Sequence, residues 1–156
     1  MRKIPMKNYV ILLVLFVATI LLTIGIFDIY KKKTKKVSTL YDFLNKITIN
    51  EIDSFTMENP ESLIYISSKY NAEYNEFEKS LSKKISSINL YDKAVFINTA
   101  EITQSEQIKL KNKYNNYDKC DNSPLLLILQ DKNVMQSICV SDGTNVDDID
   151  YEVFKW

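Results

Sequence analysis

Two cysteines and the lack of histidine limit the chemistry open to this 156-residue chain. Histidine is the commonest general base and the commonest transition-metal ligand, so its absence excludes the histidine-dependent serine and cysteine hydrolases. Cys120 and Cys139 are too few to form a thiolate zinc site on their own. They can form one disulfide or remain two inert thiols. No metal and no cofactor are expected.

The stretch from Leu63 to Ile88 joins a strand to a helix and predicts where a site would lie. Leu63 to Ile66 form an apolar run with a β-branched and aromatic bias, typical of a buried strand. Apolar side chains then recur at spacings of three and four, at Tyr74, Phe77, Leu81, Ile85 and Ile88. Open α/β sheets place their working residues at the carboxyl ends of strands. We therefore expect a site in the loop of residues 67–74.

The remaining elements predict an α/β domain with a mixed sheet and helices on both of its faces. A capping box at Thr103 and Glu106 opens one further helix. The other expected elements are a helix after a Ser38 or Thr39 cap, strands over 52–57 and 94–97, a hairpin formed by 125–129 and 134–140, and a short closing helix from Val146.

The cysteines lie near each other in the expected hairpin. A turn at Asp131 and Lys132 pairs Leu129 with Val134, and counting outward then pairs Pro124 with Cys139. Cys139 would lie beside the chain that leads out of Cys120. A disulfide is possible there if the loop folds back within about 7 Å. No helix N-terminus follows either thiol to lower its pKa, so such a bond would act as a staple rather than a catalyst.

Charge separates the first 36 residues from the rest. They hold eight basic side chains and one acidic side chain, whereas residues 37–156 hold 12 basic and 19 acidic ones, a net charge of −7. Such a domain repels phosphate backbones, so no nucleic-acid partner is expected. The basic flanks favour an anionic lipid surface.

An uncharged run from Asn8 to Phe27 predicts a single transmembrane helix over about residues 8–29. The run is longer than the apolar region of a cleaved signal peptide, and no small-x-small cleavage site follows it. We expect an N-terminal segment of residues 1–36, with the anchor and a Lys-rich collar, and a domain of residues 37–156. The five lysines after the span favour a cytoplasmic domain. The short N-terminal tail favours an uncleaved signal anchor with the domain outside the cytoplasm, and we expect the latter.

The order of these elements resembles the thioredoxin fold. The resemblance depends on the strand that feeds a helix, on the crossover strand and helix, and on Ser123-Pro124 entering the hairpin. It extends over about residues 38–156 and is closest to the small membrane-tethered thioredoxin-like proteins that accompany bacteriocin transport and maturation. The resemblance implies a cis bond before Pro124 that faces the active-site loop. It also places the two cysteines of the family's C-x-x-C motif at Asn71 and Tyr74.

The loss of both sulfur atoms changes the expected function. Dithiol exchange requires a thiolate at a helix N-terminus and a second thiol that resolves the mixed disulfide. Asn71 is instead expected to cap the helix, and Tyr74 to pack partly into the core. The residues of the former redox site, available for a protein or peptide partner, are Tyr70, Asn71, Tyr74, Ser123 and Pro124.

We therefore expect a non-enzymatic, single-pass membrane protein that binds a peptide or protein and assists its secretion or maturation at the bacterial envelope. Its partners would be the lipid bilayer and that peptide or protein. Two alternatives stay open. One is a thiol-disulfide oxidoreductase that uses Cys120 and Cys139, and the other is a toxin-immunity or complex subunit.

Overall fold

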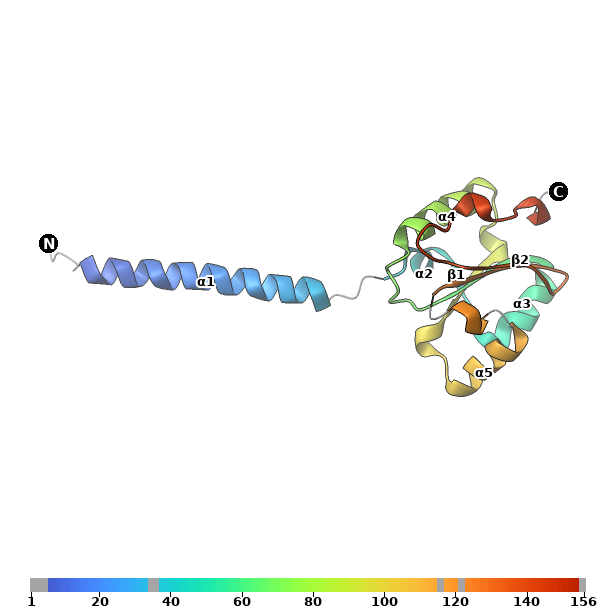
Figure 1. Ribbon diagram of the computed structural model, residues 1–156, viewed down its shortest axis with the longest axis horizontal. Coiled ribbons are helices and arrows are strands. Elements are labelled where there is room, and N and C mark those ends of the chain that lie inside the picture. Colours follow the sequence, from blue (N-terminus) through green and yellow to red (C-terminus); the bar gives the residue numbers. More distant parts are fainter. Residues whose placement is uncertain (1–5, 34–36, 115–116, 121–122, 155–156) are drawn as a thin grey trace. The chain divides into compact units, whose positions relative to one another are not determined.

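The computed structural model describes residues 6–33, 37–114, 117–120 and 123–154, drawn in colour in Figure 1. The chain divides into two compact units, Met1–Lys35 and Lys36–Trp156, and each is described by itself.

Helix α1 (Met6–Lys33) belongs to the first unit. Its described side chains, those of residues 9–25, carry no charge and are exposed. Among the described residues, none of the helices contains an apolar stretch that would span a bilayer. The predicted span over about residues 8–29 is therefore not confirmed.

The second unit contains a five-stranded mixed sheet, as predicted. Its strands follow the order β1-β3-β2-β4-β5 across the sheet. The first three are parallel to one another, and β4 and β5 follow as an antiparallel pair. The strands are β1 (Asn45–Lys46), β2 (Glu61–Ser67), β3 (Ala94–Asn98), β4 (Leu125–Gln130) and β5 (Asn133–Cys139).

Apolar side chains on alternate residues of the central strands build a core on each face of the sheet. Leu63 and Tyr65 of β2 belong to one cluster, whereas Ile64 and Ile66 belong to the other. This arrangement follows from the pleat, which directs successive side chains to opposite faces. The apolar run of β2 reads as continuous because both faces are covered.

Helices cover both faces, which confirms the predicted layers. Leu40 of α2 and Leu81 and Ile85 of α4 pack on one face, and Ile52 of α3 and Leu110 of α5 pack on the other. Figure 1 shows α4 and α5 on opposite sides of the sheet. The helices are α2 (Thr39–Phe43), α3 (Ile52–Glu58), α4 (Asn75–Ser87) and α5 (Gln104–Lys113).

Local signals fix where two of these helices begin. The Ser38 hydroxyl accepts a hydrogen bond from the Tyr41 N–H and caps α2. Thr103 and Glu106 form the predicted capping box at the start of α5. The predicted closing helix is instead two short 3-10 turns, Val146–Asp148 and Glu152–Phe154.

The predicted strand over residues 52–57 is wrong, because this segment forms α3. Its buried side chains are Ile52 and Thr56, four residues apart, which is the spacing of a helix and not of a strand. The edge strand β1 was not predicted. It is two residues long and both of its side chains are exposed, so it has no apolar pattern to recognise.

The hairpin has the predicted turn and nearly the predicted register. Asp131 and Lys132 have φ angles of 50° and 68°, as a two-residue type I′ turn requires. Leu129 pairs with Val134 as expected, but the register shifts between Ile128 and Leu129. Cys139 therefore pairs with Leu125, and the predicted pairing of Cys139 with Pro124 is wrong by one residue.

Candidate functional site

The loop between β2 and α4 is a tight turn that exposes Tyr70. The Asn71 N–H donates to the Ser68 carbonyl at 2.9 Å, and the Tyr70 N–H donates to the Ser68 hydroxyl at 3.2 Å. The Tyr70 side chain is 45% exposed. The loop therefore presents an aromatic side chain at the carboxyl end of β2, where the sequence predicted a site.

Lys69 links this loop to the end of β3 through a hydrogen bond and an ion pair. Its N–H donates to the Asn98 Oδ1 at 2.9 Å, and its ammonium pairs with Glu101. The ammonium also lies 5.1 Å from the centroid of the Tyr70 ring. The contact with Lys69 is the main cause that holds the pKa of Glu101 below its usual value.

Tyr74 and Ser123 meet across the sheet's end, although 49 residues separate them. The Tyr74 hydroxyl lies 3.3 Å from the Ser123 Oγ, and either group can donate. Tyr74 is the residue that precedes α4, and Ser123 leads into β4. Pro124 is buried, and its carbonyl accepts the Val140 N–H at 2.8 Å. The structure thus joins the two segments that the prediction assigned to one site.

Two local expectations at this site are wrong. Asn71 does not cap α4, since the helix begins at Asn75 after Tyr74 and the three residues from Ala72 to Tyr74 intervene. Asn75 instead accepts hydrogen bonds from the N–H and hydroxyl of Thr39, at 3.1 and 3.2 Å. No cis peptide bond occurs among the described residues, so the bond between Ser123 and Pro124 is trans.

A buried carboxylate on α4 contacts α2 and β2, and it was not predicted. Glu78 of α4 is 0% exposed. Its carboxylate accepts hydrogen bonds from the Ser38 hydroxyl at 2.8 Å, the Tyr65 hydroxyl at 3.0 Å and the Leu40 N–H at 3.2 Å. It thereby ties the start of α2 to α4 and β2.

Burial raises the pKa of Glu78, and the hydrogen bonds that it accepts oppose this rise only in part. Burial also raises the pKa of the Tyr65 phenol, and the neighbouring Glu78 charge adds to the effect. A sequence signal was present, because Tyr74, Glu78, Leu81 and Ile85 follow the spacing of one helix face. A glutamate inside such an apolar stripe indicates a buried acid with hydrogen-bond donors.

Of the two alternatives for Cys120 and Cys139, a disulfide or two inert thiols, the structure contains the disulfide. The two Cα atoms lie 5.2 Å apart, within the usual range for this bond. Cys120 is 4% exposed. The bond joins the segment before Ser123 to the end of β5, so it fixes the loop that carries Ser123.

A hollow opens beside Tyr74, between the start of α4 and the loop of residues 141–146. It encloses about 290 Å³, and its walls include Glu73, Tyr74, Phe77 and Asp142. No group of three or more His, Cys, Asp or Glu side chains suited to a metal is found within the described residues.

These contacts describe a surface with no thiol at its centre. Asn71 has no group that titrates near neutral pH, and the phenol of Tyr74 is a far weaker nucleophile than a thiolate. An exposed tyrosine, the hydroxyl pair of Tyr74 and Ser123 and a concave wall can instead hold a peptide segment, since tyrosine is enriched in protein interfaces. No protein-family model matches the chain, and no curated protein matches it.

Proposed function

We propose that the second unit is a redox-inactive thioredoxin-like module that binds a peptide or protein at the surface formed by Tyr70, Tyr74 and Ser123. In this proposal the module assists the secretion or maturation of that partner at the bacterial envelope. The observation that carries the proposal is the contact between Tyr74 and Ser123, at 3.3 Å. It unites the segment where a C-x-x-C motif would stand with the segment that enters the hairpin.

The sheet supports the fold part of the proposal. The three features that carry the resemblance lie in one sheet: β2 feeding α4, β3 crossing over to α5, and Ser123-Pro124 entering the hairpin of β4 and β5. The trans bond before Pro124 departs from that pattern. Since Pro124 is buried, partner contacts in this segment belong to Ser123 rather than to the proline ring.

The burial of Cys120, together with the partial burial of Cys139, favours binding over the alternative of an oxidoreductase. Thiol-disulfide exchange requires that an attacking thiolate reach one sulfur in line. Cys120 is 4% exposed and packs in the core cluster beneath β4. In the proposal this bond is a structural staple.

We also propose that the uncharged run from Asn8 to Phe27 anchors the chain in a membrane. Its support is the exposure of the described apolar side chains of α1, several of them more than 60% exposed, such as Leu12, Leu13 and Phe16. Burying such a surface in lipid is favourable by about 25 cal/mol for each Å². The Lys-rich residues 31–36 would then lie at the lipid headgroups.

Photocrosslinking in intact cells tests both the binding surface and the membrane anchor. Benzoylphenylalanine replaces Tyr70 in the full-length chain, and the membranes are isolated after irradiation. We expect one discrete peptide or protein adduct, recovered with the membranes and lost on Ser123→Trp, which places a bulky indole at the surface.

Tyr91 offers a matched control position. It is 40% exposed against 45% for Tyr70, and it precedes β3, so it lies at the opposite end of the parallel strands. The same crosslinker at Tyr91 should give no such adduct. Equal adducts at both positions would overturn the binding surface, and recovery of the chain outside the membrane fraction would overturn the anchor.

A further inference from the structure

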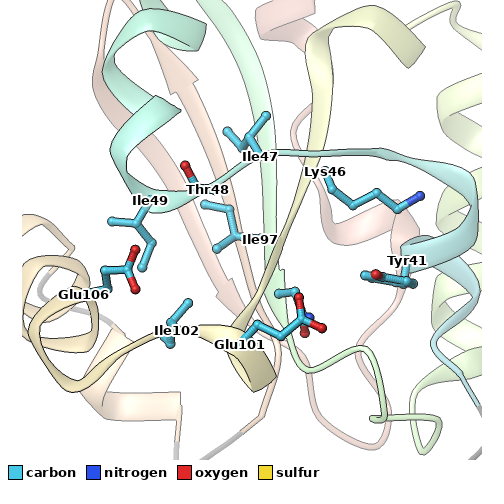
Figure 2. A pocket seen from close by; sticks show the side chains of 10 residues that line it. Tyr41, Lys46, Ile47, Thr48, Ile49, Ile97, Glu101, Ile102 and Glu106 are labelled. Carbon is cyan, nitrogen blue, oxygen red and sulfur yellow. The ribbon is translucent and has the colours of Figure 1, made fainter.

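A second pocket lies at the carboxyl end of β3, apart from the hollow beside Tyr74. It encloses about 170 Å³ and takes its walls from the segment after β1, from the end of β3 and from the start of α5. Figure 2 shows Tyr41 and Lys46 at one end of it and Ile49 and Glu106 at the other. The lining residues of the two concave sites do not overlap.

The pocket lies where the fold favours ligands. The chain leaves β2 toward α4 on one face of the sheet and leaves β3 toward α5 on the other face. In open α/β sheets, ligands bind outside the carboxyl ends of strands where the connections diverge in this way. Lys69 and Asn98 close the gap between these two strand ends, and Asn98 also lines the pocket.

One wall of the pocket is aliphatic. Its four isoleucines come from two distant segments of the chain, and Ile97 at its base is 1% exposed. The four are Ile47, Ile49, Ile97 and Ile102. Pockets that bind drug-sized ligands enclose about 300–1,000 Å³, so this pocket suits a single side chain rather than a nucleotide or a cofactor.

The charges at the rim leave one cation for a ligand. Glu101 is paired with Lys69, and Glu106 accepts the N–H and hydroxyl of Thr103, both at 2.8 Å. Lys46 lies over the Tyr41 ring, 5.0 Å from its centroid. None of the ion pairs found between described residues involves Lys46. Its ammonium therefore offers hydrogen-bond donors to an external carboxylate.

We propose that this pocket binds the C-terminal residue of a peptide whose last side chain is aliphatic. The side chain packs against the isoleucines, and the terminal carboxylate accepts hydrogen bonds from the Lys46 ammonium. A terminal residue fits a pocket this small because its side chain and its carboxylate leave the same Cα atom. In an extended peptide, the side chains that flank an aliphatic residue point to the opposite face, so an adjacent acidic side chain does not reach Lys46.

The test uses the full-length chain in a mild detergent, with carbon-13 labels in the isoleucine methyl groups. N-acetyl-L-leucine is the probe, and N-acetyl-L-leucinamide is the matched neutral compound. We expect the acid to shift the methyl signals of Ile47, Ile97 and Ile102 but not those of Ile88 and Ile108, which are exposed and do not line the pocket. The acid should bind at least about tenfold tighter than the amide, because hydrogen bonds to charged groups are the stronger ones.

Lys46→Gln should remove the preference for the acid, whereas Lys83→Gln on α4 should keep it, since Lys83 is also an exposed lysine but does not line the pocket. The proposal is overturned by equal affinity for acid and amide, by binding of neither compound, or by a preference that survives Lys46→Gln. Methyl shifts that change with protein concentration alone would assign the pocket to a second copy and would also overturn it. The outcome is independent of the surface at Tyr74, which neither variant alters.

Discussion

Reduction of the Cys120–Cys139 disulfide should lower the free energy of unfolding by about 3 kcal/mol, because the bond closes a loop with a sequence separation of 19 residues. The folded contacts need not change for this effect to appear. The open chain gains conformational freedom only in the unfolded state, and the loop length sets the size of that gain. Urea denaturation with and without a reductant measures the difference.

The double variant Cys120→Ala and Cys139→Ala separates the bond from other effects of the reductant. It should unfold at a lower urea concentration than the oxidised wild type and should be insensitive to reductant. Because Cys120 is buried, its truncation adds a small cavity cost that reduction of the wild type does not. Identical unfolding curves for the reduced and oxidised wild type would show that the bond does not act as a staple.

Removal of the buried Glu78 carboxylate should lower the free energy of unfolding by a similar amount. Glu78→Ala leaves the Ser38 hydroxyl, the Tyr65 hydroxyl and the Leu40 N–H without their acceptor. Each buried donor left without a partner costs about 1–3 kcal/mol, and the two hydroxyls can turn to recover part of this, so we expect a loss of about 3 kcal/mol. Glu76→Ala, on the exposed side of the same helix, should cost less than about 1 kcal/mol.

The raised pKa of Glu78 gives stability a definite pH dependence. The folded state holds this proton more tightly than the unfolded state, whose carboxyl titrates near the ordinary value of 4.5. The free energy of unfolding should therefore fall as the pH rises from about 4.5 through the raised pKa. Tyr65 is the titratable neighbour that bonds to Glu78, and it stays protonated throughout because its own pKa is raised.

Glu78→Gln should remove this fall while keeping the size of the side chain and one acceptor. Urea unfolding of both proteins between pH 4.5 and pH 8 gives the comparison, with Glu76→Gln as the matched neutral change on an exposed site. An unchanged pH slope in Glu78→Gln would contradict the assignment of Glu78 as the titrating group.

The elements that the sequence predicted well are those whose pattern is local. The run from Leu63 to Ile66 is apolar because both faces of β2 are covered, and the α4 residues repeat with the period of a helix. The capping box at Thr103 is read from four consecutive residues. The hairpin register at Leu129 and Val134 follows from the length of the turn alone.

The elements that were not predicted from the sequence depend on contacts with residues distant in the chain. Residues 52–57 have a mixed pattern, and their helical form follows from packing Ile52 into the core beside Ile49 and Leu110. Strand β1 exists only because β3 lies beside it. The shift between Ile128 and Leu129 depends on the local twist of the strand pair and has no sequence marker.

The candidate site likewise has features that a local pattern predicts and features that arise only from tertiary contacts. The position of the loop after β2 was predictable from the strand and helix around it. The contact of Tyr74 with Ser123 supports the predicted grouping, but the roles of Lys69, Asn98 and Glu101 arise from tertiary contacts. The pocket at Lys46 likewise combines Ile47 and Ile102, which no local pattern joins.

Restoring the lost motif tests the central claim, that the loop before α4 is the site of a dithiol scaffold without its sulfur atoms. The variant Asn71→Cys with Tyr74→Cys places one thiol at the residue that precedes α4, where the helix dipole favours a thiolate, and the second thiol three residues earlier in the loop. We expect this variant to catalyse insulin reduction by dithiothreitol well above the wild type, whose rate should not exceed that of the uncatalysed reaction. A variant that folds like the wild type yet stays inactive, or a wild type that is itself active, would contradict it.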